Sequence, residues 1–394
     1  MVFFKDRIST IEDTGTAGLG RRAELARSWM FEASFPLWSE NGVADEGGFW
    51  ESLDLQGRPL ENPVSRVRVQ ARQVFVFALA AVMGWQPKRS LELVRIGLRN
   101  LHQACRREDG LYGRTVDLNS RELSDDRADL YDSAFVLLAH AWALRAGAGA
   151  EALTGGMALS MAIDQRLRCL NNRGRYFERL PATDRVEQNP HMHLLEASLA
   201  WHEAARDQRS LQRSQELVAL MESRFVDREL SGLREVFSED WGPHEDDRFE
   251  AGHQYEWVWL LHEHGRICSE RVSSVAPLLY RKGRELTLPN GRIYLSHELN
   301  GDVREIVHRC WGLTEALKAE LALVRAGDTD RIATANAVFD RLWTDHIQGA
   351  ISGGWLDRLD SSGKPVSTDM PASTGYHLHL AFSELIDVVR ILSR

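Results

Sequence analysis

The sequence predicts an all-α protein built as an (α/α)6 barrel, a ring of six helical hairpins with about twelve helices. Two observations carry this prediction. Helical stretches of two kinds alternate along the 394 residues, and short glycine-aromatic segments recur between them at a period of about 60 residues. A repeat of this length is a supersecondary unit that cannot bury its own apolar surface, so neighbouring copies must stack.

The two kinds of helical stretch differ in how their apolar residues are distributed. Residues 88–105 and 208–223 place apolar side chains on one face and charged ones on the other, as in a helix with one solvated face. Four further stretches are apolar on most sides, namely 67–83, 130–146, 254–262 and 376–392. A helix that is apolar all round is buried. We therefore expect inner helices of the second kind, covered by outer helices of the first.

Six short segments between the helices resemble one another. They read Gly-Gly-Phe-Trp-Glu from residue 47, Gly-Leu-Tyr-Gly-Arg from 110, Gly-Arg-Tyr-Phe-Glu from 174, Gly-Leu-Arg-Glu-Val-Phe from 232, Gly-Arg-Ile-Tyr from 291 and Gly-Gly-Trp-Leu-Asp from 353. Six copies suit closure into a ring, and neither end looks like the polar cap of an open solenoid, which is the alternative. We expect one domain over residues 1–394, with residues 1–16 as an N-terminal extension and loops or short strands at one end.

Composition limits the classes of partner. The formal net charge is −9, whereas nucleic-acid and anionic membrane surfaces need clustered lysine and arginine. No apolar run approaches the roughly 20 residues that span a bilayer, and the first residues lack a signal pattern. The four cysteines are far apart without metal-binding spacing, which favours reduced thiols. We expect a cytoplasmic protein without nucleic-acid or membrane partners.

Polar residues stand near the starts of the expected inner helices, all at the same end of the barrel. They are Arg72 on the first helix, Tyr131 and Asp132 on the second, Asn189 and His193 on the third, His253 and Glu256 on the fourth, Trp311 and Glu315 on the fifth, and His377 on the sixth. Asn189, followed by Pro190, is the expected N-cap of the third helix, and Ser373 or Thr374 that of the sixth.

Three of these side chains are histidines on different helices. The partial positive charge of a helix N-terminus disfavours imidazolium, so His193, His253 and His377 should be neutral near pH 7 and able to exchange protons. His253 and Glu256 are three residues apart and therefore share a helix face. A single histidine of this kind is more often structural. Three histidines at the same end of the barrel, together with Arg72, predict an active site.

Other chemistries find less support. The histidine pairs at 191/193, 262/264 and 377/379 are two residues apart and diverge on a helix, so no metal site is expected. The sequence contains no Gly-x-Ser-x-Gly nucleophile motif and no phosphate-binding loop. A glycosidase needs two opposed carboxylic acids. Glu256 and Glu315 are candidates for that pair, although histidines outnumber carboxylates at the helix starts.

Several of these stretches resemble the N-acylglucosamine 2-epimerase family, and the resemblance extends over nearly the whole chain. The stretches that carry it are Gln70-Ala71-Arg72, Tyr131-Asp132-Ser133-Ala134-Phe135, Asn189-Pro190-His191-Met192-His193-Leu194-Leu195-Glu196-Ala197, Gly252-His253-Gln254-Tyr255-Glu256-Trp257, Trp311-Gly312-Leu313-Thr314-Glu315 and Tyr376-His377. The segment from Trp311 to Ala319 is most similar to the mannose isomerase branch. The resemblance implies an (α/α)6 barrel that interconverts sugars at C1 and C2.

The resemblance also implies a role for each residue. His253 and His377 are the expected acid–base pair on opposite sides of the sugar, and Arg72 is the cation expected to stabilise an enediolate oxygen. Glu256 would orient His253, and His193 would bind sugar hydroxyls and assist ring opening. The expected substrate-binding residues are Asn189, Tyr112, Trp311, Glu315 and Trp50. No metal or other cofactor is implied.

The sequence thus predicts a cofactor-independent aldose–ketose isomerase for a neutral hexose, with D-mannose to D-fructose as the first choice. A 2-epimerase of N-acylglucosamine or a glucose-type sugar is the alternative, because the same histidines return the proton either to C1 or to C2. An (α/α)6 glycosidase and a non-catalytic binding protein are further alternatives. The expected partner is a monosaccharide, and a homodimer through outer helices is a further expectation.

Overall fold

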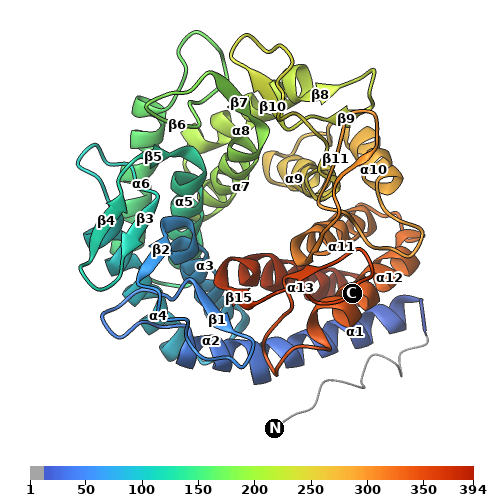
Figure 1. Cartoon of the computed structure of the whole chain (residues 1–394), viewed down its shortest axis with the longest axis horizontal. Coiled ribbons are helices and arrows are strands. Elements are labelled where there is room, and N and C mark those ends of the chain that lie inside the picture. The colour runs from blue at the N-terminus through green and yellow to red at the C-terminus, as the bar shows by residue number, and fades with distance from the viewer. Residues whose placement is uncertain (1–12) are drawn as a thin grey trace.

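Two concentric rings of helices form the protein, as Figure 1 shows in a view along the barrel. The computed structural model describes residues 13–394. The inner ring consists of α3 (Val67–Met83), α5 (Leu130–Arg145), α7 (Gln188–Ala205), α9 (Ala251–Cys268), α11 (Cys310–Arg325) and α13 (Ala372–Leu392). The (α/α)6 barrel expected from the repeat is confirmed.

The outer ring covers the inner one and contains several π-helical turns. Its elements are α1 (Thr16–Trp29), η2 (Met30–Ser34), α2 (Phe35–Asn41), α4 (Pro87–Asn100), η3 (Leu101–Cys105), α6 (Ala150–Arg166), α8 (Gln208–Leu220), η4 (Met221–Phe225), α10 (Ala276–Glu285), α12 (Arg331–Leu342) and η5 (Trp343–Ile347). The amphipathic stretch 88–105 is therefore α4 with η3, and the stretch 208–223 is α8 with the first part of η4.

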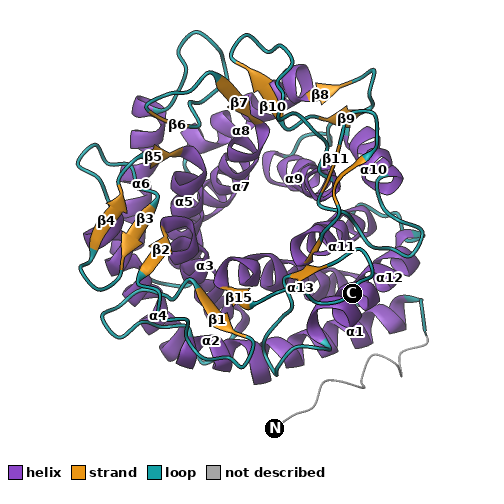
Figure 2. Cartoon of the chain, viewed as in Figure 1, coloured by secondary structure: helices purple, strands orange, loops and turns teal. Residues whose placement is uncertain are grey.

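Short antiparallel strands join each hairpin to the next at one end of the barrel, as Figure 2 shows. They are β1 (Ser52–Asp54), β2 (Val64–Arg66), β3 (Thr115–Asp117), β4 (Glu122–Asp125), β5 (Ala128–Asp129), β6 (Arg179–Leu180), β7 (Arg185–Glu187), β8 (Val226–Asp227), β9 (Gly232–Leu233), β10 (Val236–Ser238), β11 (Ser296–His297), β12 (Val303–Glu305), β13 (His308–Arg309), β14 (Arg358–Leu359) and β15 (Asp369–Pro371). Pairs such as β2–β3, β5–β6, β7–β10 and β13–β14 link successive repeats.

The last repeat closes onto the first. Strand β1 pairs with β15, with Leu53 opposite Met370, and helix α13 packs against both α3 and α1. An open solenoid would leave these apolar faces exposed, so the contacts exclude that alternative. Closure brings the starts of all six inner helices to the strand end of the barrel, which is where the candidate site residues lie.

Close packing of the inner helices depends on small residues at particular crossings. At Gly252, in the first turn of α9, a Cβ atom would lie 2.2 Å from the Trp311 ring of α11. That distance is far below van der Waals contact, so glycine is required for Trp311 to approach α9. Trp257 on the same helix is fully buried, and truncating a buried tryptophan to alanine costs about 3–5 kcal/mol.

Two expected helix starts differ from the structure. Helix α7 begins at Gln188 with Glu187 in the N-cap position, so Asn189 lies inside the first turn and does not cap it. Helix α13 begins at Ala372, and Thr374 Oγ1 donates to Asp357 Oδ1 at 2.7 Å instead of capping the helix. In both cases the preceding strand sets the start, because its pairing carries extended backbone up to the helix.

Two further expectations concern the ends of the chain and membranes. The extension expected over residues 1–16 falls almost entirely outside the described residues, and Thr16 already belongs to α1. Within residues 13–394, no helix is long and apolar enough to cross a bilayer.

Candidate active site

A cavity of about 290 Å³ opens where the inner helices begin. Seven of the ten residues singled out from the sequence line it: Arg72, Asn189, His193, His253, Glu256, Trp311 and His377. They come from five inner helices, α3, α7, α9, α11 and α13. The volume lies at the lower end of the range for small-molecule sites, which suits a compact polar ligand.

His253, in the first turn of α9, is held by carboxylates. Its Nδ1 lies 3.0 Å from both carboxylate oxygens of Glu235 and 3.4 Å from a carboxylate oxygen of Glu250. Burial lowers the pKa of His253, but the charges of Glu235 and Glu250 outweigh burial and raise the pKa to about 9. His253 is therefore an imidazolium at neutral pH, and the neutral ring expected from the helix N-terminus alone is wrong.

Further hydrogen bonds hold the side chains of Glu235 and Glu250 in place. The Gln188 side-chain amide donates to Glu235 at 2.7 Å, and Trp257 Nε1 donates to the Gln188 side-chain oxygen at 2.7 Å. Arg248 donates to Glu250 at 2.8 Å. With Nδ1 engaged by carboxylate, the His253 Nε2–H is the donor that remains for the cavity.

His377 also has a carboxylate partner, but unlike His253 its ring is uncharged. Its Nδ1 donates to Glu315 Oε1 at 2.8 Å. Burial, together with the positive charges of Arg72 and Lys318, lowers the pKa of His377 well below its usual value. The ring is therefore neutral, with its proton on Nδ1, since that nitrogen faces a carboxylate. Nε2 then offers a lone pair to the cavity, as a base requires.

Trp311 lies between these two histidines. Its ring centroid is 5.0 Å from that of His253 and 6.1 Å from that of His377. An aromatic surface between an acid and a base suits the apolar C–H face of a sugar.

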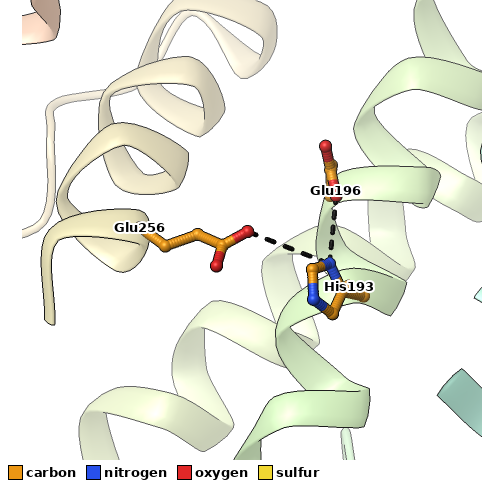
Figure 3. Close-up of side chains that lie close together, drawn as sticks. All are labelled: His193, Glu196 and Glu256. Atoms are coloured by element: carbon orange, nitrogen blue, oxygen red, sulfur yellow. Dashed lines mark hydrogen bonds and ion pairs between the residues drawn. The ribbon is translucent and has the colours of Figure 1, made fainter. Parts of the chain in front are cut away.

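His193, on α7, is a third neutral imidazole at the cavity. Its Nδ1 donates to Glu196 Oε2 at 3.1 Å, as Figure 3 shows, and the other oxygen of Glu196 accepts from the Tyr376 hydroxyl. Burial lowers the pKa of His193 to about 4, although Glu196 acts in the opposite direction. His193 is thus a fixed, uncharged hydrogen-bonding group.

Glu256 faces His193 rather than orienting His253. One of its oxygens lies 3.9 Å from His193 Nδ1 (Figure 3), and neither oxygen has a hydrogen-bond partner in the described part of the chain. Burial and the charge of Glu315 raise the pKa of Glu256 to about 8. The charge of Lys318 acts on this pKa in the opposite direction. The orienting role expected for Glu256 belongs, in geometry, to Glu235.

Arg72 directs its charge into the cavity. Its guanidinium donates to the Tyr131 hydroxyl at 2.8 Å and lies 4.0 Å from the Phe135 ring centroid. For residues 13–394 the structure records no carboxylate within 4 Å of it. The other lining arginines each have a carboxylate partner, in the pairs Arg66–Glu51, Arg68–Asp132, Arg248–Glu250 and Arg309–Asp357. Arg72 is thus the lining arginine best placed to meet a negative charge on a ligand.

Three residues expected in the pocket do not line it. Tyr112 is only 2% exposed, and its backbone bridges to Arg106 just after η3, so it packs in the barrel wall. Trp50 is half-buried beside the loop of the first repeat and also lies outside the cavity. Glu315 is fully buried beneath His377. Their expected contact with substrate therefore has no support in the geometry.

Sequence reasoning overlooked Glu235, although a signal for it was present. Four of the six glycine-aromatic segments carry an acidic residue three or four positions after a glycine: Glu51, Glu178, Glu235 and Asp357. In the structure Glu51 binds Arg66, Asp357 binds Arg309 and Glu235 binds His253. The recurring acid thus meets cationic groups at the helix starts, and the copy beside His253 is the one with a chemical consequence.

Two clusters in the described residues bring three potential metal ligands within 4.8 Å of one another. They are His193 with Glu196 and Glu256, and His253 with Glu235 and Glu250. In both clusters the Nδ1 atom of the histidine is already directed at a carboxylate, and Arg248 occupies Glu250. Each carboxylate of the two clusters except Glu256 thus already has a hydrogen-bond or ion-pair partner in the described residues. The expectation that no metal is used stays a prediction.

Comparison with known proteins gives a consistent result. The family described as N-acylglucosamine 2-epimerase (GlcNAc 2-epimerase) matches residues 48–381. The chain is 31% identical over 384 residues to a mannose-6-phosphate isomerase of Rhizobium meliloti (strain 1021), covering 93% of this chain and 97% of that protein. It is 29% identical to a D-mannose isomerase of Thermobifida fusca, covering 86% and 88%.

The fold is shared with a solved structure as well. The cellobiose 2-epimerase from Spirochaeta thermophila DSM 6192 superposes with a TM-score of 0.87 at 19% identity, covering 98% of this chain and all of that one. The family match spans most of the chain and includes the three histidines of the cavity. The chain therefore belongs to the N-acylglucosamine 2-epimerase family and is an enzyme of the isomerase and epimerase class.

Proposed function

We propose that the protein is an aldose–ketose isomerase that acts on a neutral hexose, with D-mannose and D-fructose as the preferred pair. One observation carries the proposal: His253 and His377 line the same cavity, each anchored through Nδ1, one charged and one neutral. Such a pair supplies an acid and a base at the same pH. The names of the two sequence relatives support a mannose-type substrate.

The chemistry follows from the charge states. In the open-chain aldose, neutral His377 removes the C2 proton through Nε2 while the His253 imidazolium gives a proton to the carbonyl oxygen O1. The enediol forms with Arg72 stabilising the developing oxygen charge. His377 then returns its proton to C1, and His253 takes the proton from the O2 hydroxyl. The ketose results, and both histidines regain their starting states.

The pairing of the arginines supports a neutral substrate over a phosphorylated one. Four of the five arginines at the cavity are held by carboxylates, and Glu250 and Glu305 also line it. A phosphate is bound best by guanidinium forks that are free to donate. We expect kcat/KM for mannose to exceed that for mannose 6-phosphate by about tenfold or more, which corresponds to roughly 1.4 kcal/mol or more. Equal or reversed values would contradict this substrate choice.

Epimerisation at C2 is the second candidate. Because His253 is protonated, it could deliver its proton to C2 from the side opposite His377 instead of assisting at O1. The product would then be the 2-epimer of the starting aldose. The same residues serve both outcomes, and the position of the returned proton separates them.

The test is incubation of the purified enzyme with mannose in D2O, followed by NMR of the C1 and C2 protons. Isomerisation forms fructose, with deuterium at C1 to the extent that His377 exchanges its proton with solvent before returning it. Glucose formed from mannose with deuterium at C2 would show epimerisation instead. Formation of neither a ketose nor a 2-epimer from mannose, glucose or N-acetylglucosamine would contradict both candidates.

We further propose that the enzyme acts in the cytosol as a homodimer. All four cysteines are free thiols, consistent with a reducing compartment. Light scattering of the purified protein would give its mass in solution, and a single-chain mass of about 44.7 kDa would contradict the dimer.

A further inference from the structure

Lys318 occupies a place where a charged side chain is costly. It lies on α11 one turn after Glu315 and is 0% exposed. Its Nζ is 2.6 Å from Glu315 Oε2 and 3.9 Å from the centroid of the Trp259 ring. A buried ammonium persists only where opposite charge compensates for the lost water.

That compensation comes from three different inner helices. Glu315 belongs to α11 itself, Glu256 to α9 and Glu196 to α7. Burial lowers the pKa of Lys318, but these three carboxyl groups outweigh burial and raise it. Lys318 is therefore a fixed cation and not a nucleophile. We call Lys318, Glu196, Glu256 and Glu315 the charged floor.

The charged floor lies directly beneath the histidines of the cavity. Glu315 binds His377 Nδ1, and Glu196 binds His193 Nδ1. On the other side, Glu196 and Trp259 line a second cavity, of about 510 Å³, formed by the C-terminal halves of the inner helices. Lys318 thus belongs to the layer that separates two cavities, and its charge acts on the catalytic side chains from below.

Lysine is rare in this protein. Lysine and arginine together number 48, and only five of these residues are lysines. Arginine is the common cation of this protein, yet among the basic residues in 13–394 the one with 0% exposure is a lysine. A compact ammonium with three donors can sit among carboxyl groups from three helices, whereas the planar guanidinium fork demands more room and a fixed geometry.

We propose that Lys318 is a positioning residue of the isomerisation: its buried ammonium, 2.6 Å from Glu315, holds Glu315 in place as the anchor of His377 Nδ1 and so leaves His377 Nε2 free to accept a proton. This proposal rests on the proposed function, because His377 has a catalytic role only if the protein is the proposed isomerase. It concerns a residue that touches neither the cavity nor the substrate.

The charged and titratable groups around His377 come from five inner helices. Arg72 on α3, His193 on α7 and Lys318 on α11 lower its pKa, as burial does most strongly, whereas Glu196 on α7 raises it. Glu315 on α11 accepts its Nδ1 proton, Tyr376 on α13 binds Glu196, and Glu256 on α9 belongs to the floor. Removing Lys318 should therefore raise the pKa of His377, and neutralising Glu196 should lower it.

The first variant is Lys318→Met, which keeps the length and removes the charge. The expected result is a shift of the acid limb of the kcat/KM profile to higher pH by about one unit, with activity recovering at alkaline pH. A merely structural role would lower activity equally at every pH. Lys282→Met is the matched control, because Lys282 is also buried, pairs with Glu285 at 3.0 Å and lies over an aromatic ring, but on outer helix α10. Its acid limb should not move.

Two more variants keep the test decisive if Lys318→Met does not fold. Glu196→Gln should move the acid limb to lower pH, and the double variant, which removes one charge of each sign, should bring it back towards the wild type. A limb that stays in place in folded Lys318→Met or Glu196→Gln, or that moves the same way in both, would overturn the proposal. NMR titration of the His377 imidazole in the same proteins gives the shift without any turnover, so failure of the proposed activity remains distinguishable.

Discussion

The two sides of the active site are built alike but charged differently. On the α9 side, His253 Nδ1 faces Glu235, and on the α13 side His377 Nδ1 faces Glu315. The pKa of His253 is raised to about 9, whereas that of His377 is lowered well below the ordinary value. Burial acts in the same direction on both rings, so the difference comes from the neighbours.

Those neighbours differ in sign. Beyond Glu235, His253 has Glu250 at 3.4 Å, a second negative charge. Beyond Glu315, His377 has the cations Lys318 and Arg72 acting on it. The carboxylate on Nδ1 fixes the orientation and tautomer of each ring, and the net charge around that carboxylate fixes its protonation. One repeated motif can therefore supply both an acid and a base.

The largest expected effect is the loss of either histidine. His377→Gln or His253→Gln should lower kcat by about 10³-fold, since general acid–base groups contribute roughly 10²–10⁴-fold. Thermal unfolding should stay close to that of the wild type. His379→Gln is the control on the same helix, because His379 binds Ser34 and the Gly375 carbonyl away from the cavity. The His379→Gln variant should have a lower Tm, and kcat of the folded protein should be nearly unchanged. If both His377→Gln and His253→Gln retain activity, the two histidines are not the acid–base pair.

A smaller effect is expected when the two sides are made more alike. Glu235→Gln removes the first charge beside His253, so its pKa should fall from about 9 and the imidazolium should be lost at lower pH. Because the acid must be protonated, the alkaline limb of kcat/KM should move to lower pH, with about a tenfold loss at pH 8. Glu250→Gln should give a shift of the same sign but smaller size. If the alkaline limb is unchanged in both variants, it does not report the titration of His253.

The smallest effect is expected for a residue that belongs to neither side of the active site. Tyr112→Phe should change kcat/KM by less than about twofold, because Tyr112 lies in the barrel wall and not at the cavity. Steady-state kinetics on mannose would check this. A loss of about tenfold or more would restore the substrate contact that the family resemblance implied.

The sequence was sufficient for the elements whose signal is local. Helix α3 coincides with the apolar stretch 67–83, and the repeat period led to the closed barrel. The starts of α7 and α13 were misplaced because strand pairing overrides capping preference there. Tyr112 lies outside the cavity, and the repeat pattern could not show this because an aromatic residue in each repeat serves packing as readily as binding.

The partner of His253 could not be found from helix spacing. Glu256 shares a face with His253, but Glu235 reaches it from a strand segment 18 residues earlier. Likewise, the charge of His377 depends on Lys318 and Arg72, which come from other helices of the closed ring. Such contacts between repeats exist only once the barrel has formed. Local pattern identified the histidines, and tertiary structure decided their charge.

The most direct test of the account is the protonation state of the two histidines. NMR of ¹⁵N-labelled imidazoles, assigned with the His253→Gln and His377→Gln variants, reports the protonation of each ring nitrogen between pH 5 and 10. His253 is expected to be an imidazolium at pH 7 and to lose its proton near pH 9. His377 is expected to be neutral at pH 7, with its proton on Nδ1. Two rings in the same charge state at pH 7, or the reverse assignment, would contradict the division into an acid and a base.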